Sequence, residues 1–145
     1  MIFNRKLFAF AVLSVMAILG TSLCAVPFEE GAWKNIDPNT RGITRVDIRF
    51  VCQDQIRNGQ PYPPGPPFYV HLYGSCSPQD CDWGEVGAVE ISNDFLYATY
   101  DQGFAKRYVY LRKSQRVQDG LWLYMYTDFT DPSRQDYTMQ QWFKK

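Results

Sequence analysis

The sequence has little of several features on which enzymes and nucleic-acid-binding proteins depend. It contains one histidine, His71, and four cysteines, and its fifteen Lys and Arg are balanced by fifteen Asp and Glu. Nucleic acids and anionic membranes bind an excess of basic residues, which this chain lacks. A single imidazole also leaves a serine or cysteine nucleophile only one candidate base. We therefore expect no enzyme, no cofactor and no nucleic-acid partner.

The one long hydrophobic run lies at the N-terminus. Arg5 and Lys6 precede a mainly apolar run from Leu7 to Leu19, which small residues follow up to Ala25. This order is typical of a secretory signal peptide. The run has thirteen residues, whereas a spanning helix needs roughly 20. We predict a signal peptide over residues 1–25 and no permanent membrane span.

The cleavage position has more than one reading. Cleavage after Ala25 leaves residues 26–145 as one secreted or periplasmic domain with a net charge of −2, because the removed segment carries two basic residues and no acid. Cleavage after Ser22 is the second possibility. Cys24 follows the apolar run, so the alternative localisation is a protein lipid-anchored through this cysteine.

Beyond the N-terminal segment, no long apolar pattern has helical spacing. Short runs rich in Val, Ile, Tyr, Phe and Trp instead recur between clusters of Gly, Pro, Asn and Asp, as in β-sandwiches and β-barrels. We predict eight strands: Ala32–Ile36, Ile43–Cys52, Phe68–Gly74, Trp83–Ser92, Phe95–Tyr100, Lys106–Ser114, Leu121–Phe129 and Tyr137–Lys144. Mostly short connections favour an all-β fold, a single small antiparallel eight-stranded up-and-down β-barrel, with a β-sandwich as the alternative.

One long connection interrupts this pattern. Residues 53–67 contain five prolines, which cannot donate the hydrogen bonds of a strand ladder. We predict a partly extended, polyproline-like loop on the surface.

Alternation along the predicted strands assigns side chains to two faces. Val46 and Ile48 alternate with Arg45, Asp47 and Arg49, so the aliphatic set marks the core. The same rule places a set of rings on the other face: Tyr69, His71, Tyr73, Tyr108, Tyr110, Trp122, Tyr124 and Tyr126.

A solvent-exposed sheet face does not require eight large aromatic side chains. If strands 106–114 and 121–129 pair, their rings become cross-strand neighbours. We hypothesise that they form a contiguous aromatic strip that binds a ligand. Two alternatives remain open. The tyrosines pack on one another without any partner, or they point inward around a cavity.

The cysteines suggest one disulfide. Export makes disulfides the expected use of cysteine, and removal of Cys24 leaves Cys52, Cys76 and Cys81. Cys52 and Cys76 lie at opposite ends of a predicted antiparallel pair, too far apart to bond. We predict a Cys76–Cys81 disulfide and a buried, inert thiol at Cys52. Oxidation removes the thiolates that a metal site beside His71 needs, so we expect no metal.

Gly31, Ala32 and Trp33, at the start of the first predicted strand, resemble the opening of calycin barrels, the lipocalin and avidin-like group. In that group the tryptophan closes one end of an eight-stranded barrel, and a basic side chain stacks on it. The resemblance implies this role here for Lys144 or Lys145.

Two longer runs, WKNIDPNTRGITR and HLYGSCSPQDCDWGEV, resemble a group of small bacterial secreted or surface domains. The resemblance implies export and a single domain, and it transfers no reaction. Members of that group carry histidine where this chain has Ser77, and they usually lack the proline-rich insertion.

The expected function is that of an exported binding module. Sugar rings suit an aromatic surface, because their apolar faces stack on aromatic planes while tyrosine hydroxyls form hydrogen bonds. Carbohydrate is therefore the first candidate partner, and a secreted or envelope protein is the second. The alternatives are a barrel with an internal small-molecule cavity and a structural envelope protein without a ligand.

Overall fold

The computed structural model describes residues 23–145. The predicted signal peptide, residues 1–25, lies outside this range except for its last three residues. The strands are β1 (Gly31–Asn35), β2 (Ile43–Phe50), β3 (Gln55–Arg57), β4 (Gln60–Tyr62), β5 (Phe68–Gly74), β6 (Cys81–Ile91), β7 (Phe95–Asp101), β8 (Ala105–Lys113), β9 (Leu121–Phe129) and β10 (Tyr137–Lys144), with one 3₁₀ turn, Ser92–Asp94.

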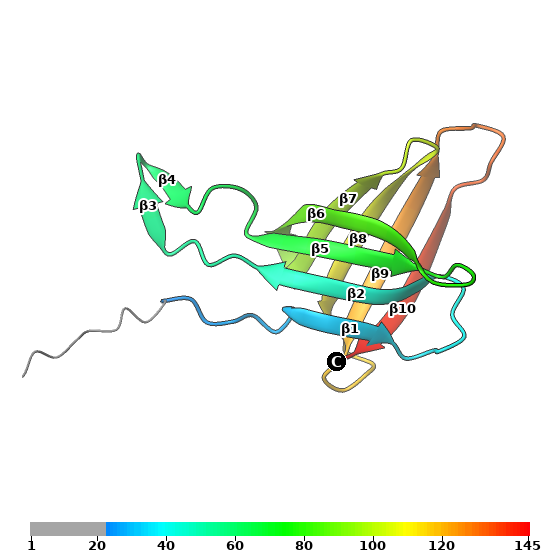
Figure 1. The fold of residues 1–145 in the computed structure, drawn as a ribbon, viewed down its shortest axis with the longest axis horizontal. Helices are drawn as coiled ribbons and strands as arrows, with labels where there is room; N and C mark the ends of the chain where they lie inside the picture. The colour runs from blue at the N-terminus through cyan, green and yellow to red at the C-terminus, as the bar shows by residue number, and fades with distance from the viewer. Residues whose placement is uncertain (1–22) are drawn as a thin grey trace, which may run out of the picture.

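Eight of these strands form a closed antiparallel barrel (Figure 1), in the spatial order β1-β10-β9-β8-β7-β6-β5-β2. The predicted up-and-down barrel is confirmed, and the predicted strand ends differ from the observed ones by two residues at most. Neighbours in sequence are neighbours in space, as short connections require. Among the described residues, no helix is long and apolar enough to cross a membrane.

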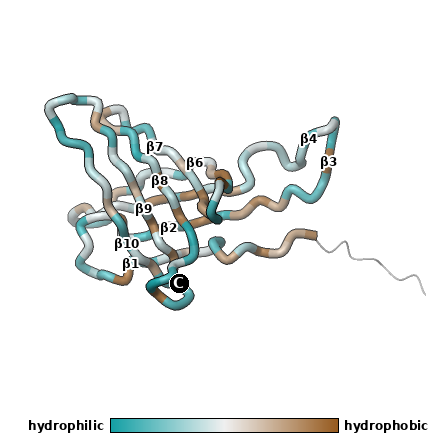
Figure 2. The backbone as a smooth tube through the Cα atoms, turned by 180° about the vertical axis from the view of Figure 1, so that it is seen from behind, coloured by the Kyte–Doolittle hydropathy of each residue, from teal (hydrophilic) through white to brown (hydrophobic). Residues whose placement is uncertain are grey.

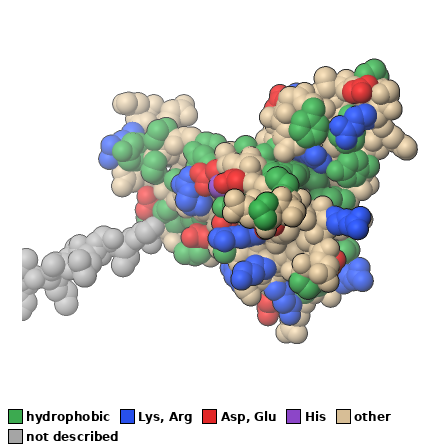
Figure 3. All heavy atoms as spheres, turned by 45° about the vertical axis from the view of Figure 1, so that its right-hand side comes forward, with side chains coloured by type: hydrophobic (Ala, Val, Ile, Leu, Met, Phe, Trp, Pro, Cys, Tyr) green, Lys and Arg blue, Asp and Glu red, His purple; other side chains and the backbone are tan. Residues whose placement is uncertain are grey.

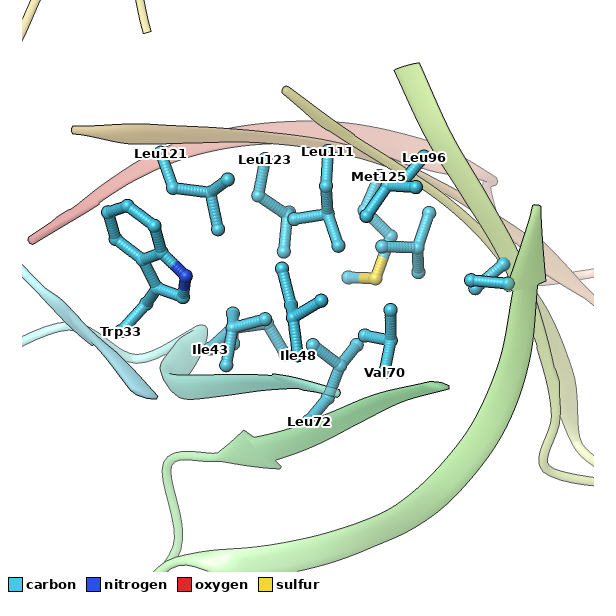
Figure 4. Close-up of a cluster of buried hydrophobic side chains, with 14 of the residues drawn as sticks. Trp33, Ile43, Ile48, Val70, Leu72, Leu96, Leu111, Leu121, Leu123 and Met125 are labelled. Atoms are coloured by element: carbon cyan, nitrogen blue, oxygen red, sulfur yellow. The ribbon is translucent and has the colours of Figure 1, made fainter. Parts of the chain in front are cut away.

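Alternation fills the barrel with aliphatic side chains. In β9 every second residue from Leu121 to Thr127 is buried, and β5 alternates in the same way from Phe68 to Gly74. Figure 2 shows hydrophobic colour within the strands and hydrophilic colour at the turns that join β8 to β9 and β9 to β10. Figure 4 shows the resulting cluster of buried side chains. The predicted inner face is therefore confirmed.

Trp33 closes one end of this core. Its side chain is fully buried, and it lies at the same end of the cluster as Leu121 (Figure 4). The indole Nε1–H donates to the Glu29 carbonyl at 2.8 Å, and Lys145 Nζ lies 4.7 Å from the ring centroid. Lys145 is therefore the basic residue above the tryptophan, whereas Lys144 pairs with Lys34 in the sheet.

The proline-rich connection differs from the prediction of a polyproline-like loop. Its centre is a two-stranded antiparallel hairpin, in which β3 pairs with β4 and which projects away from the barrel (Figure 1). Asn58 and Gly59 join the strands with φ values of 50° and 76°. Positive φ at both positions is what the Asn-Gly pair favours in a two-residue hairpin turn. This signal outweighs the five prolines, since only Pro61 lies within a strand.

The cysteines form two disulfides, Cys24–Cys52 and Cys76–Cys81. The second was predicted and is confirmed. The prediction of a buried free thiol at Cys52 was wrong, because it assumed that Cys24 is removed. Cys52 lies beyond the end of β2, where it meets the segment that leads into β1, and the two α-carbons are 5.7 Å apart.

Two pairings of the closed barrel are short, and the one between β1 and β10 covers two positions. β6 and β7 pair at three positions only, between Val89–Ile91 and Phe95–Tyr97. Beyond them Tyr100 of β7 reaches both β5 and β6: its hydroxyl proton lies between the Val70 carbonyl of β5 at 2.7 Å and the Gly84 carbonyl of β6 at 3.0 Å. Burial raises the pKa of Tyr100 well above its usual range, so the hydroxyl stays protonated. A side chain thus closes the part of the ring that backbone pairing leaves open.

Removal of the Cys24–Cys52 disulfide should destabilise the domain more than removal of the Cys76–Cys81 disulfide. The two rings span sequence separations of 28 and 5 residues. The loop-entropy relation gives about 3–4 kcal/mol for the larger ring and about 2 kcal/mol for the smaller. Urea unfolding of Cys52→Ser and Cys81→Ser variants measures both losses. An equal or larger loss for Cys81→Ser contradicts the expectation.

Leu123→Ala should lower the free energy of unfolding by about 2–5 kcal/mol, because it leaves a cavity in the core. Leu123 is fully buried. The matched control is Ile56→Ala in the β3–β4 hairpin, where the side chain is 69% exposed and the change should stay within about 0.5 kcal/mol. Chemical unfolding followed by circular dichroism measures both, and similar losses would refute this assignment of the core.

Candidate aromatic binding site

The outer face of β7, β8 and β9 carries a shallow depression walled by aromatic rings. Its volume is about 600 Å³, and we call it the aromatic groove. The lining residues are Phe95, Tyr108, Tyr110, Trp122, Tyr124 and Tyr126. Each is half-buried, so one side of the ring packs on a neighbour while another meets solvent.

The strand register places these rings side by side. β8 and β9 pair Tyr108 with Tyr126 and Tyr110 with Tyr124, and the ring centroids are 6.0 and 5.9 Å apart. β7 contributes Phe95, whose ring lies 5.9 Å from Tyr110 and 5.7 Å from Trp122. The predicted hairpin of aromatic neighbours is therefore present.

Polar groups hold the two ends of the groove. The Arg112 guanidinium lies 4.6 Å from the Phe95 ring centroid and 4.9 Å from that of Trp122. The Trp122 Nε1–H donates to Gln140 Oε1 at 3.1 Å. These contacts hold the Trp122 indole against the sheet, which lowers the entropy that a ligand would otherwise have to remove.

At the other end, the Tyr126 hydroxyl donates to Asp136 Oδ2 at 3.0 Å. This hydrogen bond to a carboxylate is the main reason that the pKa of Tyr126 is raised. Tyr126 is therefore already partnered. By contrast, the hydroxyls of Tyr108, Tyr110 and Tyr124 form no hydrogen bond with any residue of the described range 23–145. Three phenol groups are left to hydrogen-bond a ligand.

The remaining three predicted site residues lie elsewhere. Tyr69, His71 and Tyr73 are on β5, which β6 and β7 separate from β8. The predicted strip is present on β8 and β9, but the assignment of these three residues to the same binding surface was wrong, because the outward rings form two separate faces. The reason is topological, since alternation along a strand says which side a residue faces but not which strands adjoin. Phe95 was missed, although alternation within its own strand could have identified it.

The face around β5 is a network of paired charges. Arg49 Nη2 donates to Glu85 Oε1 at 2.8 Å, and the Arg49 guanidinium lies 4.2 Å from the Tyr69 ring centroid. This hydrogen bond is the main cause of the lowered pKa of Glu85. On β2, Arg45 forms an ion pair with Asp47.

The histidine belongs to the same network. The His71 ring stacks on Tyr73 with centroids 4.5 Å apart, and its Nε2 forms a hydrogen bond with Asp82 Oδ1. Figure 3 shows the histidine among acidic and basic side chains. The backbone N–H of Gly84 first, and His71 second, lower the pKa of the Asp82 carboxyl. Since these groups satisfy one another, we place the candidate site on the aromatic groove.

Potential metal ligands are also engaged. The sulfurs of Cys76 and Cys81 are bonded to each other. Cys24, Cys52 and Asp54 bring their ligand atoms within 4.8 Å of one another, but the first two also form a disulfide. That cluster therefore offers a single carboxylate rather than a set of thiolates.

Asp82→Asn should destabilise the domain at neutral pH and not in strong acid. The Asp82 carboxyl has a pKa below its reference value of 3.8, so its stabilising effect is present above that value and is lost as the pH falls through the folded-state pKa. Urea midpoints of the wild type and variant, measured from pH 7 to 2, should converge at the acidic end. A pH-independent difference contradicts the assignment.

No family model, curated protein or solved structure matches the chain.

Proposed function

We propose that the protein is an exported binding module that holds carbohydrate in the aromatic groove. The observation that carries the proposal is that aromatic rings and unpartnered hydroxyls lie together on one face of the sheet. Six rings line a groove of about 600 Å³, and three of their hydroxyls have no hydrogen-bond partner in residues 23–145. Sugar binding uses both groups, since pyranose C–H faces stack on rings and sugar hydroxyls bond to phenols.

The groove supports binding rather than chemistry. Its six lining side chains include no carboxylate and no imidazole, whereas glycoside hydrolysis uses a pair of acids across the bond to be cleaved. Asp136, the carboxylate that contacts the groove residue Tyr126, accepts hydrogen bonds from its hydroxyl and from the backbone N–H of Phe129. We therefore infer a non-enzymatic role, in which the ligand leaves unchanged.

Both disulfides fit an oxidising compartment, which supports secretion or a periplasmic location. The Cys24–Cys52 disulfide also bears on how the N-terminus is processed. Cleavage after Ala25 removes Cys24, so we infer that cleavage after Ser22, the second position considered above, produces the mature chain. The same bond uses the Cys24 sulfur, which leaves no thiol for attachment of a lipid.

Trp122→Ala with Tyr124→Ala should abolish or strongly weaken carbohydrate binding. Two stacking rings at about 1 kcal/mol each correspond to roughly thirtyfold in affinity. A glycan array identifies the ligand class, and titration calorimetry with the best soluble oligosaccharide measures the loss.

The matched control is Tyr69→Ala with Tyr73→Ala on β5. These rings are also half-buried and outward-facing, so the substitution removes similar area from the other face and should leave affinity unchanged. Circular dichroism confirms that both double variants fold. Equal losses in the two variants, or unchanged binding in the groove variant, would reject the groove as the site.

A further inference from the structure

A second concave site lies at one end of the barrel, where β5, β7 and β9 end and β6, β8 and β10 begin. It has a volume of about 390 Å³, and we call it the mouth pocket. Its floor includes the core residues Ile43 and Met125, and its walls include Trp83, Phe104 and Arg107. Figure 3 turns this side of the molecule toward the viewer and shows hydrophobic side chains in the hollow between projecting lobes.

Arg107 is the unusual member of this pocket. It lies on the inward phase of β8, between Ala105 and Val109, and is only 8% exposed. Its Nε–H donates to Gln102 Oε1 at 2.9 Å. Its Nη1 donates to Thr127 Oγ1 at 2.9 Å and to the Tyr137 hydroxyl at 2.8 Å. These neutral acceptors fix the orientation of the guanidinium plane.

The charge of Arg107 has no partner of opposite sign in residues 23–145. None of the ion pairs within that range includes it, and no residue that lines the mouth pocket is acidic. Arginine stays protonated, and burying an unpaired charge is expensive. The Trp83 ring, 4.9 Å from the guanidinium carbon, offsets part of this cost through a cation–π contact. The neutral acceptors offset a further part, but no carboxylate in residues 23–145 balances the charge.

Two donors remain open toward the pocket. Arg107 Nη2 and Trp83 Nε1 make no hydrogen bond with the described residues. Every fully buried side-chain nitrogen in that range does have a hydrogen-bond partner, so these two nitrogens are not fully buried. Both nitrogens are therefore accessible from the pocket rather than sealed in the core. Trp83 reaches this position because Gly74 has no side chain: a Cβ there would lie 2.7 Å from Trp83 Nε1.

We propose that the mouth pocket binds the carboxylate group of a small organic anion. Arg107 Nη2–H and Trp83 Nε1–H donate to the carboxylate, and its charge supplies the missing counter-ion. The apolar part of the ligand packs between Phe104, which is 53% exposed, and the core side chains of the floor. The site is distinct from the aromatic groove, because inward and outward residues of β8 lie on opposite sides of the barrel wall.

The pocket favours a carboxylate over inorganic phosphate. One guanidinium nitrogen is open, and the only other cation among the lining residues is Arg41, which is exposed. A phosphate dianion needs more compensating charge than this pocket holds. The remaining walls include five large apolar side chains, Ile43, Trp83, Phe104, Met125 and Met139, which suit a hydrocarbon group rather than a hydrated ion.

Phenylacetate is the probe, and phenylacetamide and inorganic phosphate are the controls. In ¹⁵N-correlated NMR spectra of the mature chain, phenylacetate should shift the Arg107 Nε–H and Trp83 Nε1–H resonances in a saturable manner. Phenylacetamide has the same ring without the charge and should shift them at least tenfold more weakly. A response to phosphate equal to that of phenylacetate, or no response to phenylacetate, would overturn the assignment.

Arg107→Lys keeps the charge but removes the planar fork, and should weaken phenylacetate binding at least tenfold. Arg112→Lys, at the rim of the aromatic groove, is the matched control and should leave it unchanged. Because Arg107 is buried, Phe104→Ala supplies a second test at an exposed side chain, with a threefold or greater loss expected. Unchanged affinity in both Arg107→Lys and Phe104→Ala would overturn the proposal. The Trp122→Ala, Tyr124→Ala variant should bind phenylacetate normally, which separates the two sites.

Discussion

Aliphatic packing inside a closed ring of strands is the interaction on which the rest of the structure depends. Eight strands each turn alternate side chains to the interior, where residues such as Val46, Val109 and Leu123 are fully buried. Because these residues face the interior, the residues that alternate with them along each strand must face outward. Closure also pairs both edges of the sheet, so the barrel offers broad side-chain faces for recognition rather than a free strand edge.

Much of this architecture could be predicted from period-two patterns. The strands, the core face and the outward direction of the rings on β5, β8 and β9 all follow from local alternation, which needs no knowledge of neighbours. The cross-strand rings of β8 and β9 were also accessible, because a short turn joins these strands and fixes them as a pair. The extension of the aromatic groove onto β7 could also have been predicted, by applying the same alternation rule to Phe95.

Other features depend on the path of the chain through space. The position of Tyr69 and Tyr73 on a separate face follows from the order of strands around the ring, which alternation does not encode. The Cys24–Cys52 bond depends on where the segment before β1 lies, and the prediction had assigned that segment to a removed peptide. Arg107 could have been found, because an arginine on the inward phase of a strand contradicts the pattern on either side of it.

The two proposed sites use opposite sides of the same strand. Tyr108 faces the aromatic groove while Arg107, its neighbour in sequence, faces the mouth pocket. A single peptide unit thus separates an exposed apolar surface from a buried positive charge. Such an arrangement lets one thin wall present two chemistries without sharing any side chain between them.

The short pairing between β6 and β7 has a mechanical consequence. Three residue pairs hold this line of the cylinder, compared with nine between β8 and β9, and the Tyr100 hydroxyl completes it through two carbonyls. Trp83 packs edge-on against Tyr100, so this short joint of the wall borders the mouth pocket. Separation of β6 from β7 would therefore require the Tyr100 hydroxyl to give up both carbonyls.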